Sequence, residues 1–445
     1  MRRLHILSIA LGTMILIMSS GCKKYLDVNT DPDRPLNAPP GAVLSGSQVA
    51  LAYVLGGADF SLVTGILTNQ VDGADRQFAA YQKYLLVADN FSNPWGTIYQ
   101  NAMNNFVELR KAAEEKKYPY FAGISKVLTA YTLCASTDVW GDIPYSDAFK
   151  GLSFQFKSKY DKQQDIYKTI DQLITDALKD LNTPTSAAGT LPGSSDLMYG
   201  GSTAAWIKFA NSIRLRILIH QTKRDPNAAQ KVVDAASAAG GLISTGKDDA
   251  QLNFLNDEKR ANPLYQFNSQ RDGYASYGAS FLFTQMEALN DPRTDKYQPG
   301  GFYDQISSPV LYITSYEVNF ILAEAHARLG HVAQAKSYYE AAIKGSFDKV
   351  GADIGGYLTE TGVSFDDATT DDARLSLIMT QKYYAMYLQS ESFADWRRTG
   401  IPALVSKNPG QEIPRRLPYP QTELSYNKDN VPTGITLTSR VWWDQ

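Results

Sequence analysis

Apolar residues recur every three or four positions through most of the chain, which is the spacing of one face of an α-helix. Residues 94–116 show it most clearly, with apolar positions at Trp95, Ile98, Tyr99, Met103, Phe106 and Leu109. The same spacing predicts helices at residues 43–67, 120–136, 165–181, 203–221, 227–239, 311–329, 331–346 and 370–388. The pattern therefore predicts an all-α protein.

Two of these helices carry a repeat pattern. Residues 319–347 read NFILAEAHARLGHVAQAKSYYEAAIKGSF, in which small and large residues alternate around Gly330 as in a tetratricopeptide unit. Small residues let antiparallel helices approach, and large ones such as Tyr339 fill the gap to the next pair. The unit is clearest over residues 315–346, and residues 120–136 with 165–181 and 203–221 with 227–239 are weaker pairs. We expect tetratricopeptide-like helix pairs forming a scaffold, with His326 as a packing residue and His331 solvated.

The helical spacing breaks down between residues 240 and 308, where Gly, Asn and aromatic residues are mixed. Long irregular segments in a compact protein are often functional, so we expect ligand-facing loops here.

The N-terminus is typical of an exported protein. Arg2 and Arg3 precede an apolar run of about fifteen residues, too short to span a membrane, and the run ends in Ser-Ser-Gly-Cys. A Cys at this boundary indicates a lipoprotein signal, although an ordinary signal peptide with a chance Cys is the alternative. We expect a removed signal peptide at 1–21, a lipidated Cys22 with a flexible tether at 22–40, and one α-helical domain at 41–445.

Charge and cysteine content indicate which classes of ligand and site the chain does not favour. Without Arg2 and Arg3 the chain has 41 basic and 46 acidic residues, so its charge is −5 and nothing favours nucleic acid. Only Cys134 remains beside Cys22, and its helical context predicts a buried, small apolar residue. Acidic pairs at 366–367 and 371–372 lack calcium-loop spacing. We expect no metal and no cofactor.

Six sequence blocks, in order, resemble the SusD/RagB-type nutrient-binding lipoproteins of Gram-negative bacteria, closest to the SusD-like branch associated with starch binding. They are GCKKYLD (21–27), DVWGDIPY (138–145), WIKFANSIRLR (206–216), AEA (323–325), FADWRRTG (393–400) and PRRLPYP (414–420). Lys23 and Lys24 depart from the acidic residues that often mark surface export after the Cys. The resemblance nevertheless covers nearly the whole chain.

The resemblance implies a lipid-anchored outer-membrane protein, exposed at the cell surface. It would capture an oligosaccharide and cap a SusC-like TonB-dependent transporter that imports it. A peptide-binding lid, or a lid that contacts only protein, is the alternative. Such proteins bind and do not cleave, and HExxH, GxSxG and Walker patterns are absent from this chain. We therefore expect no enzyme activity.

The family blocks are expected to serve the scaffold. Trp140 should be buried, and residues 414–420 should be extended because each Pro restrains its own φ and its predecessor. Arg214 and Arg216 are expected to pair with loop carboxylates such as Asp142 or Asp147. In FADWRRTG, Trp396 should dock the helix end while Arg397 and Arg398 bond its last carbonyls.

Ligand contacts are expected instead in the irregular segments, because sugars are bound by aromatic faces and planar polar groups. The aromatic candidates are Tyr274, Tyr277, Phe302 and Tyr303, and their polar partners are Asp72, Arg76 and Arg271. Ordinary loop packing is the alternative for each. Trp95 and Tyr99 follow helical spacing and are predicted to be core residues.

Overall fold

The computed structural model describes residues 38–445, so the predicted signal peptide, Cys22 and nearly all of the tether lie outside the described residues. The expected all-α fold is confirmed. The helices are α2 (Pro40–Gly56), α3 (Val63–Leu67), α4 (Arg76–Gln82), α5 (Ser92–Gly96), α6 (Asn104–Lys116), α7 (Pro119–Trp140), α8 (Gln163–Leu181), α9 (Thr203–His220), α10 (Ala228–Ala235), α11 (Pro263–Gln270), α12 (Phe281–Ala288), α13 (Thr294–Tyr297), α14 (Ser315–Arg328), α15 (Val332–Val350), α16 (Asp371–Ala385), α17 (Glu391–Thr399) and α18 (Gln421–Tyr426).

Four short strands accompany the helices in the described part of the chain. β1 (Asp72–Gly73) pairs with β3 (Ala275–Ser276), and β2 (Ala250–Leu252) pairs with β4 (Val310–Ile313), both antiparallel. Each pair joins segments far apart in the sequence. The strands therefore fix loops onto the helical scaffold rather than form a sheet core.

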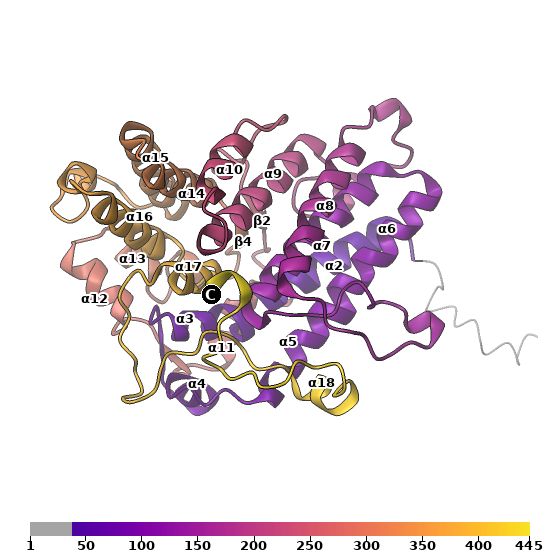
Figure 1. The fold of residues 1–445 in the computed structure, drawn as a ribbon, viewed down its shortest axis with the longest axis horizontal. Coiled ribbons are helices and arrows are strands. Elements are labelled where there is room, and N and C mark those ends of the chain that lie inside the picture. Colours follow the sequence, from indigo (N-terminus) through magenta and orange to yellow (C-terminus); the bar gives the residue numbers. More distant parts are fainter. Residues whose placement is uncertain (1–37) are drawn as a thin grey trace, which may run out of the picture.

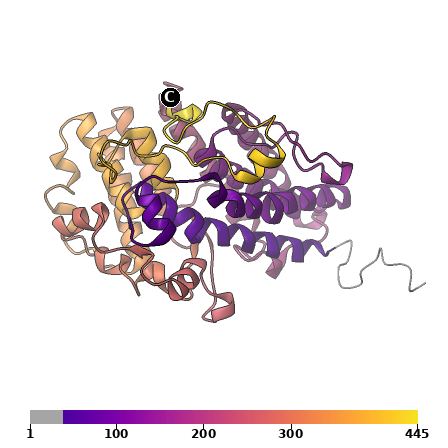
Figure 2. The same ribbon diagram turned by 90° about the horizontal axis from the view of Figure 1, so that it is seen from below.

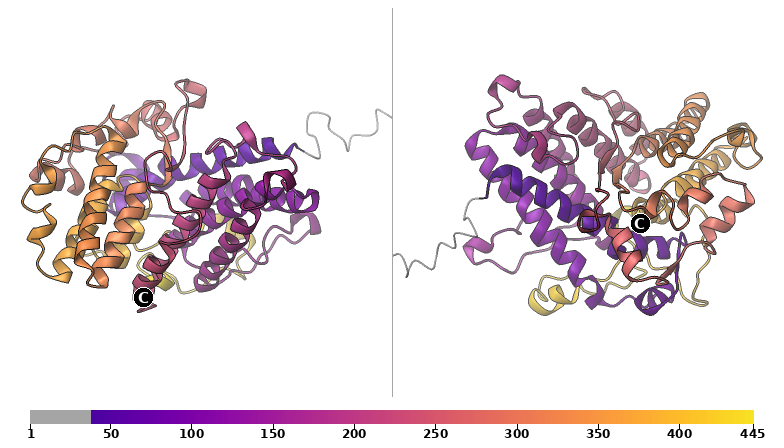
Figure 3. Two further views of the ribbon diagram at one scale, coloured as in Figure 1. Left: turned by 90° about the horizontal axis from the view of Figure 1, so that it is seen from above. Right: turned by 180° about the vertical axis from the view of Figure 1, so that it is seen from behind.

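Helices pack in sequence across the molecule, as expected of stacked helix pairs. α7 contacts α6 and α8, α9 contacts α8 and α10, and α14 contacts α9, α10, α15 and α16. Figure 1 shows this series as an arc from α6 at one end to α15 and α16 at the other, and Figure 3 shows the orange helices of that part of the chain gathered at one end. In the repeat unit, Ala335, Tyr339 and Ala342 are fully buried between helices. The tetratricopeptide-like arrangement is confirmed.

Close helix approach depends on small residues, and Gly123 on α7 shows why. A Cβ at this position would lie 2.7 Å from Cγ of Leu181 on α8, which is closer than carbon atoms normally approach. Nearly every residue of α7 is buried, including Cys134, as predicted. α7 is therefore a central helix of the scaffold.

The stretch Pro40–Leu67 is long and apolar enough to cross a membrane, with a mean hydropathy of 1.6. However, 67% of its most apolar window is buried inside the protein. A core helix passes the same test of length and composition, and this burial favours a core role for α2 and α3.

The irregular region expected at 240–308 contains three helices that the apolar spacing did not predict. α11 and α12 have eight residues each and α13 has four, so none is long enough to show a helical period. The helix expected at 311–329 instead begins at Ser315, after the strand β4. Val310 to Ile313 are apolar and rich in β-branched residues, which suits pairing with β2.

The blocks DVWGDIPY and PRRLPYP meet in space. Trp140 is buried, as predicted, and its indole Nε1 donates to the carbonyl of Pro418 at 3.0 Å. Leu417 N donates to the carbonyl of Val139 at 2.9 Å. The segment after α17 therefore returns across the scaffold, where Figures 1 and 2 show it lying over one face.

The predicted partners of Arg214 and Arg216 are wrong. Arg214 Nε pairs with Asp171 Oδ1 on α8 at 2.6 Å, and Arg216 pairs with Glu317 on α14 and Glu391 on α17. α9 lies between these helices, whereas Asp142 and Asp147 pair with Lys162 and Lys150 in their own loop. The two arginines thus join helices to each other.

The prediction for the end of α17 is only partly right. Arg397 bonds the backbone carbonyls of Phe393, in its own helix, and Arg415. Arg398 instead pairs with the carboxylates of Glu324 and Asp395, because α14 packs against this part of the scaffold and supplies a buried acid. His326 is buried and stacks on Tyr338, while His331 is exposed, as expected of both.

Candidate functional site

The β1–β3 pair brings the segment before α4 beside the loop after α11. Asp72 faces Ser276 and Gly73 faces Ala275, and Ala74 N donates to the Tyr274 carbonyl at 2.9 Å. A Cβ on Gly73 would lie 1.9 Å from the carbonyl oxygen of Phe78, so only glycine fits there. Gly73 thus lets β1 pack closely against α4, and the β1–β3 pair joins both to the irregular segment.

Two hollows lie on either side of a ridge formed by Arg271 and Tyr274. The first encloses about 630 Å³ between residues 265–278 and residues 298–304. The second encloses about 610 Å³ between α4, α11 and the segment around Asp59. Each volume is within the range of pockets that bind small ligands. Because Arg271 and Tyr274 line both hollows, we treat the two as one candidate site.

The structure brings together four of the seven residues singled out from the sequence. Arg271, Tyr274 and Tyr277 line the first hollow, and Arg76, Arg271 and Tyr274 line the second. They come from α4 and from the loop after α11, which the β1–β3 pair joins. A contact between any of them and a ligand stays a prediction.

Tyr274 combines an aromatic ring with nearby cations. Its ring packs against the ring of Phe267 at 5.8 Å between centroids, and the guanidinium of Arg76 lies 5.3 Å from its centroid. The side chain of Arg76 is 72% exposed, and its Nε also lies 3.6 Å from the exposed carboxylate of Asp75. Arg271 lies similarly, 5.2 Å from the ring of Phe267. The ridge therefore offers ring faces and planar donors together.

The first hollow has a fixed polar wall. The Tyr277 hydroxyl donates to Asn268 Oδ1 at 2.9 Å, and the Asn268 amide donates to Asp304 Oδ1 at 2.9 Å. Asp304 Oδ2 also accepts from Gly300 N at 3.0 Å. Burial raises the pKa of Tyr277, so its hydroxyl stays a neutral donor. Sequence reasoning missed Asn268 and Asp304 because it selected aromatic and cationic residues within these loops.

Asp59 contributes the acidic group of the second hollow. Its side chain reaches solvent inside the hollow but is walled by protein, and this partial desolvation raises the pKa of the carboxyl. The positive charge of Arg271 acts in the opposite direction. Asp59 lies in the π-helical turn Ala58–Leu62, inside an apolar run, so no sequence signal distinguished it.

The other three candidates lie elsewhere. Asp72 accepts from the amide of Gln82 at 3.1 Å and pairs with Lys407 at 3.2 Å. Phe302 and Tyr303 pack against each other, with ring centroids 5.0 Å apart. None of the three lines either hollow.

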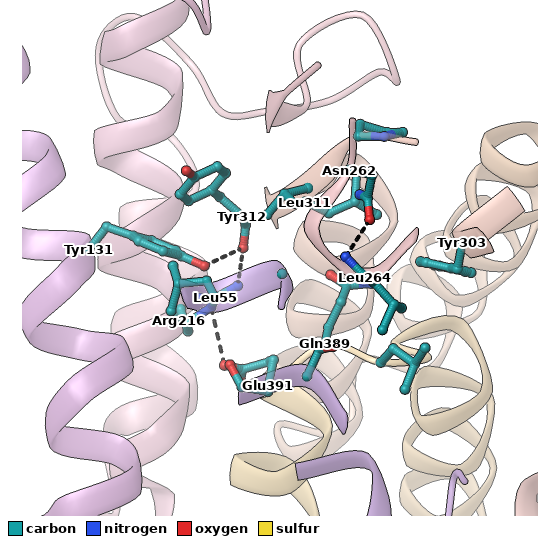
Figure 4. A pocket seen from close by; sticks show the side chains of 16 residues that line it. Leu55, Tyr131, Arg216, Asn262, Leu264, Tyr303, Leu311, Tyr312, Gln389 and Glu391 are labelled. Carbon is teal, nitrogen blue, oxygen red and sulfur yellow. Dashed lines mark hydrogen bonds and ion pairs between the residues drawn. The ribbon is translucent and has the colours of Figure 1, made fainter. Parts of the chain in front are cut away.

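Tyr303 instead borders a separate, small cavity, drawn in Figure 4. This cavity is only about 50 Å³, which holds a few water molecules but no sugar ring. Arg216 Nη2 donates to the Tyr312 carbonyl at 2.8 Å beside it, and Ser61 Oγ and the Tyr303 hydroxyl lack partners among the described residues. Its size and orphaned hydroxyls suit buried water.

Three potential metal ligands meet inside the scaffold, at Cys134, Asp138 and His220. Each already has partners, since Cys134 Sγ donates to Asp138 at 3.2 Å and His220 Nε2 lies 2.7 Å from Glu391. Burial, together with Asp138, raises the pKa of the Cys134 thiol well above its usual range. The hydrogen bonds and ion pairs of this cluster join α7, α9 and α17.

Burial alone would lower the pKa of His220. The carboxylates of Glu391 and Asp138 outweigh it and raise the pKa to about 9. His220 is thus a buried cation near neutral pH. Sequence spacing concealed this cluster, because its members are separated by up to 257 positions between Cys134 and Glu391.

Comparisons with known proteins identify relatives of the whole fold. A SusD-like family model, described as "Starch-binding associating with outer membrane", matches residues 32–303 and 300–420. A SusD-like structure from Bacteroidetes AC2a is 23% identical with a TM-score of 0.77, covering 92% of this chain and 100% of its own. A SusD homologue from Bacteroides fragilis is 24% identical with a TM-score of 0.74, with the same coverage.

A chitin-binding SusD homologue from Flavobacterium johnsoniae is 23% identical with a TM-score of 0.74, covering 90% of this chain and 98% of its own. No curated protein sequence matches the chain.

Proposed function

This chain belongs to the SusD-like family of starch-binding proteins associated with the outer membrane, and from that premise we propose that it binds an oligosaccharide at the two hollows beside Tyr274. The observation that carries the proposal is the ridge of Arg271 and Tyr274, where aromatic faces and planar donors border two ligand-sized hollows. A sugar ring stacks through its apolar face, while its hydroxyls need donors and acceptors at the edges.

The chemistry of the walls supports this ligand class. Asn268 and Asp304 are held by hydrogen bonds on one side, and Asp59 and Arg76 lie on the other. Preorganised polar groups bind without paying much ordering entropy. Two neighbouring hollows with shared lining residues suit a chain of several sugar units better than a single sugar.

We further propose that Cys22 carries the lipid anchor and that the protein works at the cell surface with a SusC-like TonB-dependent transporter. The signal-like N-terminus and the family resemblance support both. Metabolic labelling with palmitate should mark the wild-type chain and not Cys22→Ser. Affinity purification from outer membranes should recover a TonB-dependent transporter, and its absence would count against the partnership.

Calorimetry on residues 23–445 tests ligand binding directly. Malto- and chito-oligosaccharides of six units are suitable probes, because relatives are described by starch and chitin binding. Tyr274→Ala should weaken binding about tenfold, whereas Tyr338→Ala, a half-buried tyrosine on α15, should leave it unchanged. Equal effects of both substitutions, or binding of peptides and no glycan, would reject the oligosaccharide assignment.

The proposal is binding without cleavage. Incubating the bound oligosaccharide with the protein for a day should produce no new reducing ends. Turnover that disappears on changing one carboxylate of the hollows, such as Asp304→Asn, would make the protein an enzyme.

A further inference from the structure

A third open space, which we term the aromatic groove, lies apart from the two hollows. It encloses about 510 Å³ between residues 92–104, 144–158 and 422–427, and shares no lining residue with either hollow. Figure 1 labels two of its elements, α5 and α18, at the lower right. Three segments distant in sequence therefore converge on a space of ligand size.

Stacked rings form one wall of the aromatic groove. Tyr99 lies between Trp95, at 4.5 Å and 25° between ring planes, and Phe149, at 6.1 Å and 17°. Tyr99 is fixed in this orientation because its hydroxyl donates to the Pro144 carbonyl at 2.9 Å. The wall is therefore a rigid aromatic surface.

Two further rings stand at the rim and are strongly exposed. Phe156, from the loop after α7, is 75% exposed, and Tyr426, at the end of α18, is 78% exposed. Leaving such rings in water is unfavourable, and exposed apolar groups gathered at a hollow usually mark a binding site. Both rings line the aromatic groove.

Unused polar groups lie among these rings. The side-chain amides of Gln100 and Asn104 line the same space and have no hydrogen-bond partner within residues 38–445. Glu423, by contrast, is oriented by bonds from the Tyr160 hydroxyl at 2.9 Å and the Asn427 amide at 2.8 Å. The hydroxyls of a ligand would supply hydrogen-bond partners for the amides of Gln100 and Asn104.

We propose that the aromatic groove is a second oligosaccharide subsite. A pyranose ring stacks on Phe156 or Tyr426, while its hydroxyls bond the side-chain amides of Gln100 and Asn104. A sugar satisfies both features at once, since one of its faces is apolar and its edge carries hydroxyls. The inference takes only its ligand class from the proposed function.

The test removes the first site and then the second. Calorimetry with maltohexaose and chitohexaose is carried out on residues 23–445 carrying Arg271→Ala and Tyr274→Ala. This chain should retain weaker binding to one of the probes. Adding Phe156→Ala and Tyr426→Ala should reduce that residual affinity about tenfold, the cost of losing ring stacking.

Leu191→Ala is the control for the aromatic groove, because Phe154 packs edge-on against Phe156 and cannot serve as one. Leu191 is an apolar residue that is 47% exposed and lines neither the aromatic groove nor the two hollows. It should change the residual affinity by less than about twofold. Unchanged unfolding midpoints in all variants establish that the fold is intact.

The outcomes separate the two proposals. If the wild-type chain binds neither probe, the proposed function fails for these glycans. If the wild-type chain binds but the chain lacking Arg271 and Tyr274 does not, or if the Phe156 and Tyr426 substitutions leave its affinity unchanged, the second subsite is rejected and the first stands. Loss of transporter copurification together with unchanged glycan affinity would make the aromatic groove a protein contact.

Discussion

Charged residues are used differently in the helical scaffold and at the two hollows. In the scaffold, Arg216 is buried and bonds Glu317 through two nitrogens, at 2.7 Å each, and approaches Glu391 at 3.3 Å. At the hollows, Arg76 is largely exposed, and Arg271 makes no ion pair within residues 38–445. The first arrangement joins three helices, and the second leaves donors open to a ligand.

This contrast indicates that ligand specificity depends on the exposed charged residues and not on the buried ones. A buried charge must be paired within the protein, so its partners are committed to the fold. A guanidinium that stays exposed beside an aromatic ring has a small desolvation penalty, and its N–H donors remain free to bind a ligand. Residues that identify the family, such as Arg216 and Trp140, are therefore mostly structural, while the hollows are lined from outside the family blocks.

Removing a buried scaffold charge should have the largest effect. Arg216→Met leaves Glu317 buried without its partner, and we expect a loss of about 3–5 kcal/mol in the free energy of unfolding. Lys344→Met is the control, because it breaks the exposed Lys344–Asp348 pair, which is worth about 0.5 kcal/mol. Denaturant unfolding measures the free energy of unfolding of both variants. Similar losses in the two would contradict the proposed difference between buried and exposed charges.

The buried His220 predicts how stability depends on pH. Its pKa is raised from 6.5 to about 9, so its stabilising charge is fully present below pH 6.5 and lost as pH rises through 9. The wild-type chain should therefore lose about 2–3 kcal/mol of stability over this window. His220→Gln should lose less over the same window. Parallel pH profiles for the two proteins would show that His220 is not charged in the fold.

At the hollows, binding and stability should separate. Arg271→Ala removes an exposed donor, so the free energy of unfolding should change by less than about 0.5 kcal/mol. Oligosaccharide affinity should fall about fivefold, because a charged hydrogen bond contributes about 1 kcal/mol or more. Calorimetry and denaturant unfolding on the same preparation check this, and a stability loss as large as the binding loss would contradict it.

The smallest effect is expected from Tyr277→Phe, because Tyr277 is a half-buried residue that lines a hollow and also bonds within the protein. It removes only the hydrogen bond to Asn268, which should cost about 1 kcal/mol of stability or less. Affinity should change about twofold, through a less fixed Asn268 rather than through a lost contact. Wild-type affinity combined with a loosened loop 268–278 in hydrogen exchange would limit Tyr277 to a structural role.

The scaffold was largely predictable because its signals are local. Helical spacing located α6 to α9 and α14 to α16, and small residues at Ala335 and Ala342 indicated the tightly packed pair. Short elements were not predictable, since α11 to α13 are too brief to show a period. The β1–β3 pair was invisible as well, because its strands have two residues each.

The candidate site was predictable only in part. The irregular composition of residues 240–308 indicated the right loop, and Arg271, Tyr274 and Tyr277 lie around one hollow. Phe302 and Tyr303 have the same composition signal, yet they pack away from both hollows. Side-chain direction in a loop depends on its tertiary neighbours, which local sequence does not encode.

The sequence alone determined that the chain is helical, that it has repeat-like helix pairs and that it resembles SusD-like proteins, because these properties follow from residue spacing along one segment. Only the tertiary structure decided which charged and polar side chains form ion pairs and hydrogen bonds with each other. Arg216 contacts Glu317 and Glu391 instead of Asp142, and Asn268 meets Asp304, because packing places side chains from distant segments together. The aromatic groove arises in the same way, from three segments that only the fold brings into contact.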